Sequence, residues 1–134
     1  MYKVDVKGSC QENDFCRIWI SNGVMFVEYK PGLIMTLETA KFMVNERLRL
    51  SDGTSYPVLL DVRNLVSTER AAMKYYKTKE VTRYITSAAL LTGNALTSLA
   101  GNIFLTLEKP LIPTKLFTDE KKALEWLEKY KFLN

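Results

Sequence analysis

The chain contains 134 residues, of which 47% are hydrophobic and 25% are charged, and its formal net charge is +4. This length and composition predict one ordinary globular domain spanning residues 1–134, and they argue against disorder. The complete absence of histidine excludes Ser-His-Asp and Cys-His nucleophiles, imidazole acid–base catalysis and histidine-ligated metals.

The cysteines and the apolar segments indicate the compartment. Cys10 and Cys16 are the only cysteines, so no structural zinc site is expected, and both should be free thiols unless the compartment is oxidising. The longest uncharged runs are too short or too polar to supply the ~20 apolar residues that span a bilayer, and the start MYKVDVKGSC lacks the apolar core of a signal peptide. We therefore expect a cytoplasmic protein with no transmembrane segment, no metal and no cofactor.

The first third of the chain predicts a β-hairpin followed by a helix. Two β-rich runs in RIWISNGVMFVEYK flank Asn22-Gly23, a pair suited to a two-residue type I′ turn. YKVDV before it adds a further candidate strand. Thr36 is suited to cap a helix with an apolar stripe, which consists of Leu37, Ala40, Val44 and Leu48. Phe42 lies off this stripe.

Buried strands then alternate with helices. YPVLLDV and SAALLTG are short continuous apolar runs, typical of strands buried on both faces, and TKLF is a short strand. STERAAMKYYKTKEVTRYI, ALTSLAGNIFLTLEK and TDEKKALEWLEKYKF are predicted helices, the first capped by Ser67 or Thr68 and the last by Thr118. This order predicts an α/β fold: a mostly parallel central sheet with an antiparallel N-terminal hairpin at its edge and about four flanking helices.

The series PVLLDVRNL, SAALLTG and TKLFTDEKKALEWL resembles the STAS-like (SpoIIAA-like) domains, which are related to bacterial anti-sigma-factor antagonists and often grouped with SEC14-like domains. The ending LFTDEKKALEWL is most similar to uncharacterised bacterial STAS-like proteins. The resemblance covers roughly Pro57 to Leu127 and implies a fold more than an activity. In the antagonists, a phosphorylatable serine lies in an Asp-Ser-Ser-Gly-type turn. The matching region here is NLVSTERAA, which lacks that Asp and Gly. The resemblance therefore implies only a hydroxyl group at the start of this predicted helix.

The first candidate site comprises Asp61, Arg63, Ser67 and Thr68. The end of a parallel strand is where open α/β sheets bind ligands, and a phosphate on Ser67 would lie at a predicted helix N-terminus. The alternative interpretation is structural: Asp61 pairs with Arg63 or a lysine, and Ser67 caps the helix.

Two further surfaces are candidates for partners. Arg70, Lys74 and Lys77 form a basic helical stripe, which indicates either an anionic-partner face or an ordinary solvated face, and the small net charge argues against nucleic acid. In the helix Ala95–Leu107, the side opposite the core stripe carries Ser98, Gly101 and Leu105. An interior glycine costs a helix ~1 kcal/mol, so this side predicts either a dimer face or the wall of an apolar pocket.

The sequence thus favours a non-catalytic regulatory or protein-interaction module that self-associates. The alternative is a carrier or sensor of a small apolar or lipid-like ligand, which requires an apolar cavity beside Ala95–Leu107. The third hypothesis, a carboxylate-based enzyme, requires two converging acids, for which Asp61 and Glu69 are the available pair.

Overall fold

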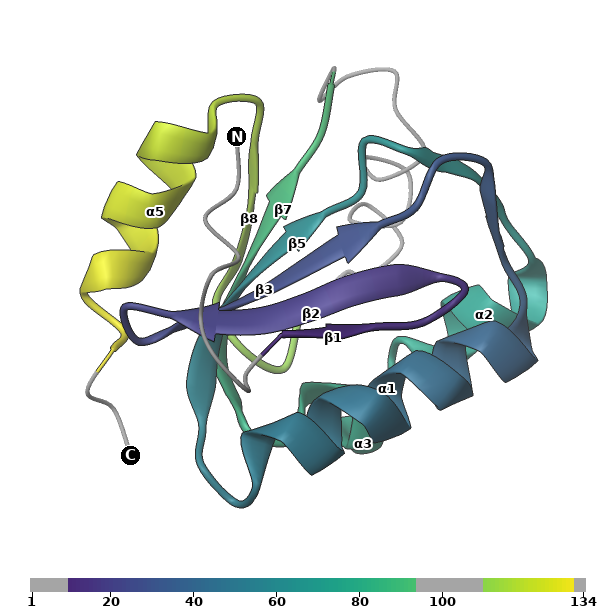
Figure 1. The fold of residues 1–134 in the computed structure, drawn as a ribbon, viewed down its shortest axis with the longest axis horizontal. Coiled ribbons are helices and arrows are strands. Elements are labelled where there is room, and N and C mark those ends of the chain that lie inside the picture. The colour runs from purple at the N-terminus through teal and green to yellow at the C-terminus, as the bar shows by residue number, and fades with distance from the viewer. Residues whose placement is uncertain (1–9, 94–109, 132–134) are drawn as a thin grey trace.

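The computed structural model describes residues 10–93 and 110–131. Its main element is a six-stranded sheet in the order β1-β2-β3-β5-β7-β8, with helices on both faces (Figure 1). The predicted strand YKVDV, the predicted helix Ala95–Leu107 and the candidate face Ser98, Gly101 and Leu105 lie outside the described residues.

The antiparallel part of the sheet is the predicted hairpin. Strands β2 (Cys16–Ser21) and β3 (Val24–Tyr29) are joined by Asn22 and Gly23, and the short β1 (Gln11–Glu12) pairs with β2 at the edge. The two turn residues have φ angles of 52° and 78°. Asparagine and glycine adopt this left-handed conformation more readily than other residues, which explains why the sequence turns here.

The other half of the sheet is parallel. Strand β3 pairs with β5 (Tyr56–Asp61), β5 pairs with β7 (Ile85–Leu91), and β7 pairs with β8 (Thr114–Phe117), all in parallel. The apolar runs of β5 and β7 are buried on both faces, as predicted for central strands of a parallel sheet. The expected architecture, a mostly parallel sheet with an antiparallel N-terminal hairpin, is confirmed.

Alternate residues of the strands serve two separate cores. Leu59, Ala89 and Leu91 pack on one face against Ala123 and Leu127 of α5 (Glu120–Glu128). The larger core on the opposite face includes Ile18, Met25, Val27, Val58, Ala40, Met43 and Val44. Figure 1 shows α5 on one side of the sheet and α1, α2 and α3 on the other.

Helix α1 (Leu37–Ser51) begins at the predicted cap. The Thr36 side chain accepts a hydrogen bond of 3.0 Å from the Thr39 backbone N–H, and Asp52 ends the helix in a left-handed conformation with a φ of 50°. Phe42, which lies off the apolar stripe, is exposed and meets Phe15 edge-on with ring centroids 5.6 Å apart. It therefore extends the apolar packing onto the hairpin.

The long helix predicted for the segment beginning at Ser67 is wrong. Residues Leu65–Thr68 form strand β6, which pairs in parallel with β4 (Leu33–Met35), and only α2 (Arg70–Tyr75) and α3 (Lys79–Thr82) are helical. The β-branched Val66 and Thr68 suit a strand, and β4 provides the partner. The Thr78 hydroxyl donates to the Tyr75 carbonyl just beyond α2, a local hydrogen bond that competes with helix continuation.

The cap of α5 is shifted by one residue from the prediction. Asp119, not Thr118, is the N-cap, and its carboxylate accepts a hydrogen bond of 3.0 Å from the Lys121 backbone N–H. An aspartate at this position also interacts favourably with the positive end of the helix dipole, which explains why it is used in preference to the neighbouring threonine.

Candidate functional site

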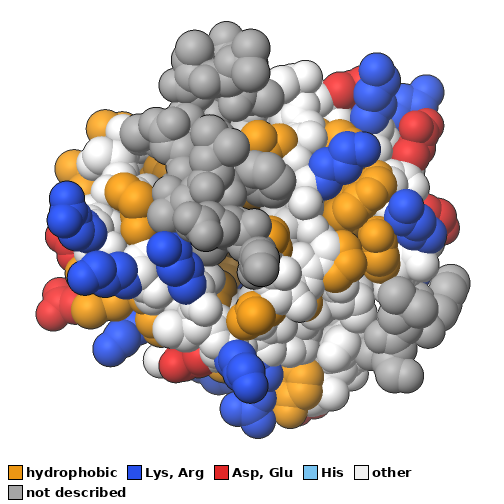
Figure 2. Space-filling view, turned by 180° about the vertical axis from the view of Figure 1, so that it is seen from behind, with side chains coloured by type: hydrophobic (Ala, Val, Ile, Leu, Met, Phe, Trp, Pro, Cys, Tyr) orange, Lys and Arg blue, Asp and Glu red, His pale blue; other side chains and the backbone are white. Residues whose placement is uncertain are grey.

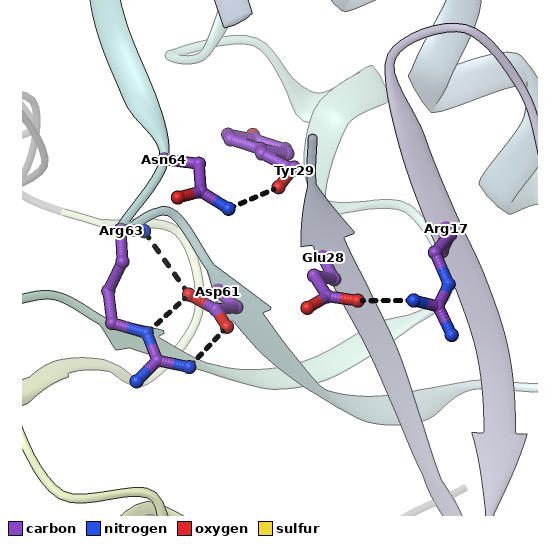
Figure 3. Close-up of polar contacts among 6 residues, drawn as sticks. All are labelled: Arg17, Glu28, Tyr29, Asp61, Arg63 and Asn64. Carbon is purple, nitrogen blue, oxygen red and sulfur yellow. Dashed lines mark hydrogen bonds and ion pairs between the residues drawn. The ribbon is translucent and has the colours of Figure 1, made fainter. Parts of the chain in front are cut away.

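Four charged side chains lie at or near the carboxyl ends of β3 and β5, two acids flanked by two arginines (Figure 3). Glu28 lies opposite Asp61 in the parallel β3–β5 register, and Arg17 lies opposite Glu28 in the β2–β3 hairpin. Arg63 follows Asp61 two residues later. Because residues paired across a sheet point to the same face, Arg17, Glu28 and Asp61 lie in one row on the α5 side.

Asp61 and Arg63 form a two-pronged ion pair. Arg63 Nε lies 2.9 Å from Asp61 Oδ1, Arg63 Nη2 lies 2.7 Å from Asp61 Oδ2, and the Arg63 backbone N–H also donates to Oδ1 at 3.2 Å. The carboxylate is buried, while the Arg63 side chain is 45% exposed. The geometry matches the structural interpretation of this pair and makes Asp61 a fixed acceptor that orients the loop after β5.

Glu28 is the acid that the sequence interpretation missed. Burial raises the pKa of its carboxyl group, Arg17 and Arg63 lower it, and Asp61 and Glu120 raise it further. Arg17 Nη1 lies 3.5 Å from Glu28 Oε1. The available signal was the hairpin register, because the Asn22-Gly23 turn fixes Glu28 opposite Arg17 at the end of a buried strand.

Ser67 and Thr68 are not helix caps, which corrects the predicted N-cap. Both lie in β6, and the residue before α2 is Glu69, which makes no side-chain cap. Thr68 Oγ1 is buried without a hydrogen bond to any described residue. A phosphate on Ser67 would therefore lie on a strand, three residues before the first residue of α2 and two residues before its acidic N-cap, Glu69. Phosphorylation of Ser67 or Thr68 stays a prediction of the family resemblance.

Glu69 and Asp61 have different partners. Glu69 Oε1 accepts a hydrogen bond of 2.9 Å from the Leu37 backbone N–H, in the first turn of α1. Its own backbone N–H donates to the Met35 carbonyl at 2.9 Å. The glutamate thus joins the start of α1 to the strand pair β4–β6, whereas Asp61 is held by Arg63.

The predicted basic stripe is only partly helical. Arg70 and Lys74 lie on α2 and are exposed, but α2 ends at Tyr75, so Lys77 lies in the following turn. Figure 2 shows lysine and arginine side chains around the margin of the face turned to the viewer, not gathered into one patch. The anionic-partner face formed by these residues stays a prediction, and Lys77 differs from the other two because it also lines a cavity.

An apolar cavity of about 440 Å³ lies between the larger core face of the sheet and the helices. Its walls are formed by α1, the segment from Tyr76 to Ile85 that contains α3, and the loop Pro110–Ile112 before β8. The sheet supplies an apolar floor, which consists of Ile18, Val27, Val58, Leu60, Ala88 and Leu90.

A comparison with protein families identifies the family of this chain. The model of the family described as "Domain of unknown function (DUF7793)" matches residues 18–131. The chain belongs to the DUF7793 family. No curated protein matches.

A solved structure supports the fold of this DUF7793 chain. The structure is that of an uncharacterised DUF3478-family protein with a SpoIIAA-like fold from Shewanella loihica PV-4. The two are 16% identical, with a TM-score of 0.61, over 87% of this chain and 98% of that one. The resemblance to STAS-like domains is thereby confirmed at the level of the fold.

The polar groups of the DUF7793 cavity were not predicted from the sequence. Arg47 lines the cavity from α1 and is buried, and Tyr29 and Tyr76, whose hydroxyl groups are hydrogen bonded to each other, also line it. Burial raises the pKa of Tyr76 to about 12. A signal for Arg47 was present, because it continues the apolar stripe of α1 at i, i+4 and i+7 from Ala40 and Val44.

Other site chemistry of the DUF7793 chain is limited in residues 10–93 and 110–131. No group of three or more cysteine, aspartate or glutamate side chains in these ranges is arranged to hold a metal ion. Cys10 is exposed, Cys16 is buried, and both are free thiols. None of the helices that the structure describes is long and apolar enough to cross a membrane.

Proposed function

We propose that this protein is a non-catalytic STAS-like module that binds a small apolar ligand in the cavity beneath α1 and α3. The observation that carries the proposal is the cavity itself. Its volume of about 440 Å³ lies within the ~300–1,000 Å³ range of small-molecule sites. The sequence favoured an interaction module over a ligand carrier; the apolar cavity supports the carrier or sensor alternative.

The composition of the cavity supports an apolar ligand. Its floor consists of aliphatic side chains from four neighbouring strands, and Met43 and Val44 of α1 add to the wall. A few polar groups, Arg47 and the Tyr29–Tyr76 pair, interrupt this apolar surface. Apolar walls with a few placed polar groups are the usual composition of a small-molecule site, because the walls supply affinity and the polar groups supply orientation.

The proposal that the module is non-catalytic rests on the acids and on the missing histidine. Asp61 is paired with Arg63, and Glu69 accepts a hydrogen bond from the start of α1, so each acid named for the enzyme hypothesis has a structural partner. Neither acid lines the cavity. Among the residues that the structure describes, a ligand held there would therefore meet no carboxylate positioned for general acid–base work.

The cavity is tested with N-phenyl-1-naphthylamine, a neutral apolar dye whose fluorescence rises on leaving water. Ala88→Phe places a large side chain in the cavity floor, and Ala71→Phe makes the same change on the exposed surface of α2. Wild type and Ala71→Phe should bind the dye in a saturable manner, and Ala88→Phe should not. Saturable binding that is equal in all three folded proteins would place the dye elsewhere and overturn the proposal.

Regulation through a protein partner and self-association are proposals that rest on the sequence. Gly101 and Leu105, which carry the predicted dimer face, lie outside the described residues. Light scattering of wild type and Leu105→Glu provides the test: a dimer that dissociates on substitution supports self-association, and the same monomer in both samples contradicts it.

A further inference from the structure

Arg47 is a buried cation in the wall of the apolar cavity. Its relative exposure is 6%, because it lies in the second half of α1 and continues that helix's apolar stripe. Arginine is almost never fully buried unless it is paired, because removing a charge from water is costly. The partners of Arg47 therefore decide what this residue does.

The partners of Arg47 are two backbone carbonyl oxygens. Nη1 donates to the Arg83 carbonyl at 2.7 Å, and Nη2 donates to the Val81 carbonyl at 2.8 Å. No aspartate or glutamate of residues 10–93 and 110–131 forms an ion pair with it. Carbonyl groups satisfy two of the donors but carry no net charge, and a guanidinium has further N–H donors.

The guanidinium remains a cation in this position. Burial lowers the pKa of Arg47 to about 10, so the group is still protonated at neutral pH. Among the described lining residues, the second charged one is Lys77, which is exposed. No described acidic residue lines the cavity. The described lining is thus apolar with positive charge only, and its electrostatic complement is an anion attached to an apolar body.

We propose that the ligand of this cavity is a single-chain amphiphile with an anionic head group, carboxylate or phosphate, which Arg47 binds while the chain lies on the aliphatic floor. This inference rests on the proposed function and specifies its ligand class. The remaining donors of Arg47 bind the head group, and the two carbonyl contacts hold the guanidinium in place. Lys77 adds positive charge at the rim, which favours entry of an anion.

The first experiment uses the wild-type chain and a matched set of ligands. Decanoate, decyl phosphate, decanol and decylammonium share one alkyl chain and differ in the head group. Each displaces N-phenyl-1-naphthylamine in a competition titration at neutral pH. Decanoate or decyl phosphate should bind at least about ten-fold more tightly than decanol, because a hydrogen bond to a charged group is worth about one order of magnitude or more. Decylammonium should bind most weakly.

The second experiment assigns the preference to Arg47. Arg47→Met keeps an unbranched apolar side chain and removes the charge, and Arg49→Met makes the same change on an exposed arginine of the same helix. Arg47→Met should abolish the preference for the anion over decanol, and Arg49→Met should retain it. Arg47→Lys, which keeps the charge, should retain part of the preference and serves as the readout if Arg47→Met does not unfold cooperatively.

The outcomes separate this inference from the proposed function. Binding of decanol as tight as that of both anions would overturn the anionic ligand class and leave an apolar cavity site. A preference for the anion that is unchanged in folded Arg47→Met and Arg47→Lys would overturn the role of Arg47. Absence of saturable binding by the dye and by every member of the series would overturn the proposed function as well. Tighter binding of one anion than the other would support the class and identify its head group.

Discussion

Glu28 and Asp61 are register partners on adjacent parallel strands, so two carboxylates lie side by side at one end of the sheet, each beside an arginine. The two acids differ in how well they are held. Asp61 has a two-pronged partner, whereas the closest contact of Glu28 with Arg17 is 3.5 Å. Asp61 therefore stabilises the folded state at neutral pH, whereas the ionised Glu28 destabilises it.

Replacing Glu28 with glutamine should stabilise the protein at neutral pH. Burial raises the pKa of Glu28 above its ordinary value of 4.5, so the folded state favours the neutral carboxyl group. Its contribution to stability is therefore present below the unfolded pKa and is lost as pH rises through the folded pKa. Urea unfolding should show Glu28→Gln more stable than wild type at pH 7 and equal to it near pH 3.

Glu12 provides a control, because its pKa is shifted in the opposite direction from that of Glu28. Its hydrogen bond to Lys30, whose Nζ lies 2.7 Å from Glu12 Oε2, lowers the pKa of this exposed carboxyl group. Its contribution is present above the unfolded pKa and is lost as pH falls through the folded value. Glu12→Gln should therefore be no more stable than wild type at pH 7. A loss of stability in Glu28→Gln at pH 7 would mean that the attraction between Glu28 and Arg17 exceeds the cost of burying the Glu28 carboxylate. It would contradict the prediction made for Glu28.

Removing Arg63 should destabilise the fold by about 1–3 kcal/mol, because a buried carboxylate loses its two-pronged partner. We expect Arg63→Met to lower the urea midpoint strongly and Arg63→Lys to restore only part of it, since an ammonium cannot reproduce the fork. Arg49→Met is the matched control: Arg49 pairs with Glu46 on the surface, and its loss should change the free energy of unfolding by less than about 0.5 kcal/mol. Equal effects of Arg63→Met and Arg49→Met would contradict a structural role for the Asp61 pair.

Gly23→Ala should lower the free energy of unfolding by about 1–2 kcal/mol, because of the backbone conformation alone. Gly23 has a φ of 78°, and a Cβ added there would lie 3.5 Å from Lys131 Cδ, an ordinary contact. Gly93→Ala is the control, since Gly93 has no positive φ and an added Cβ would meet no described atom within 4 Å. Thermal or urea unfolding of both variants checks the prediction. A neutral Gly23→Ala would show that the turn relaxes to another type.

Elements fixed by neighbouring residues were predicted well from the sequence. Asn22-Gly23 defines the hairpin, Thr36 caps α1, and TKLF forms β8, because each signal lies inside or next to its element. The segment after Val66 was predicted wrongly, because a local helical pattern competes there with pairing to β4, which is more than 30 residues away in sequence. The helix forms only after the strand has ended, so Ser67 and Thr68 lose their expected role.

The same distinction applies to the candidate sites. The Asp61–Arg63 pair was among the alternatives because its members are two residues apart. The role of Arg47 could not be derived in this way, since its acceptors Val81 and Arg83 are 34 and 36 residues away and the cavity is lined by segments far apart in the sequence, from Ile18 to Thr114. A charged residue on the buried stripe of a helix, as Arg47 is between Val44 and Ser51, marks a position to test for a binding role.

The two cysteines should differ sharply in reactivity. Burial raises the pKa of the Cys16 thiol to about 11, and the thiol accepts a hydrogen bond of 3.6 Å from the Asn13 side chain, whereas Cys10 is exposed. Because the thiolate is the reactive species, a thiol-disulfide reagent such as 5,5′-dithiobis(2-nitrobenzoate) should modify Cys10 rapidly in the native protein and Cys16 only on unfolding. Cys10→Ser should abolish the rapid phase, and Cys16→Ser should leave it intact. A rapid phase that persists in Cys10→Ser would show that Cys16 is accessible through local opening of β2, and would contradict its place in the core.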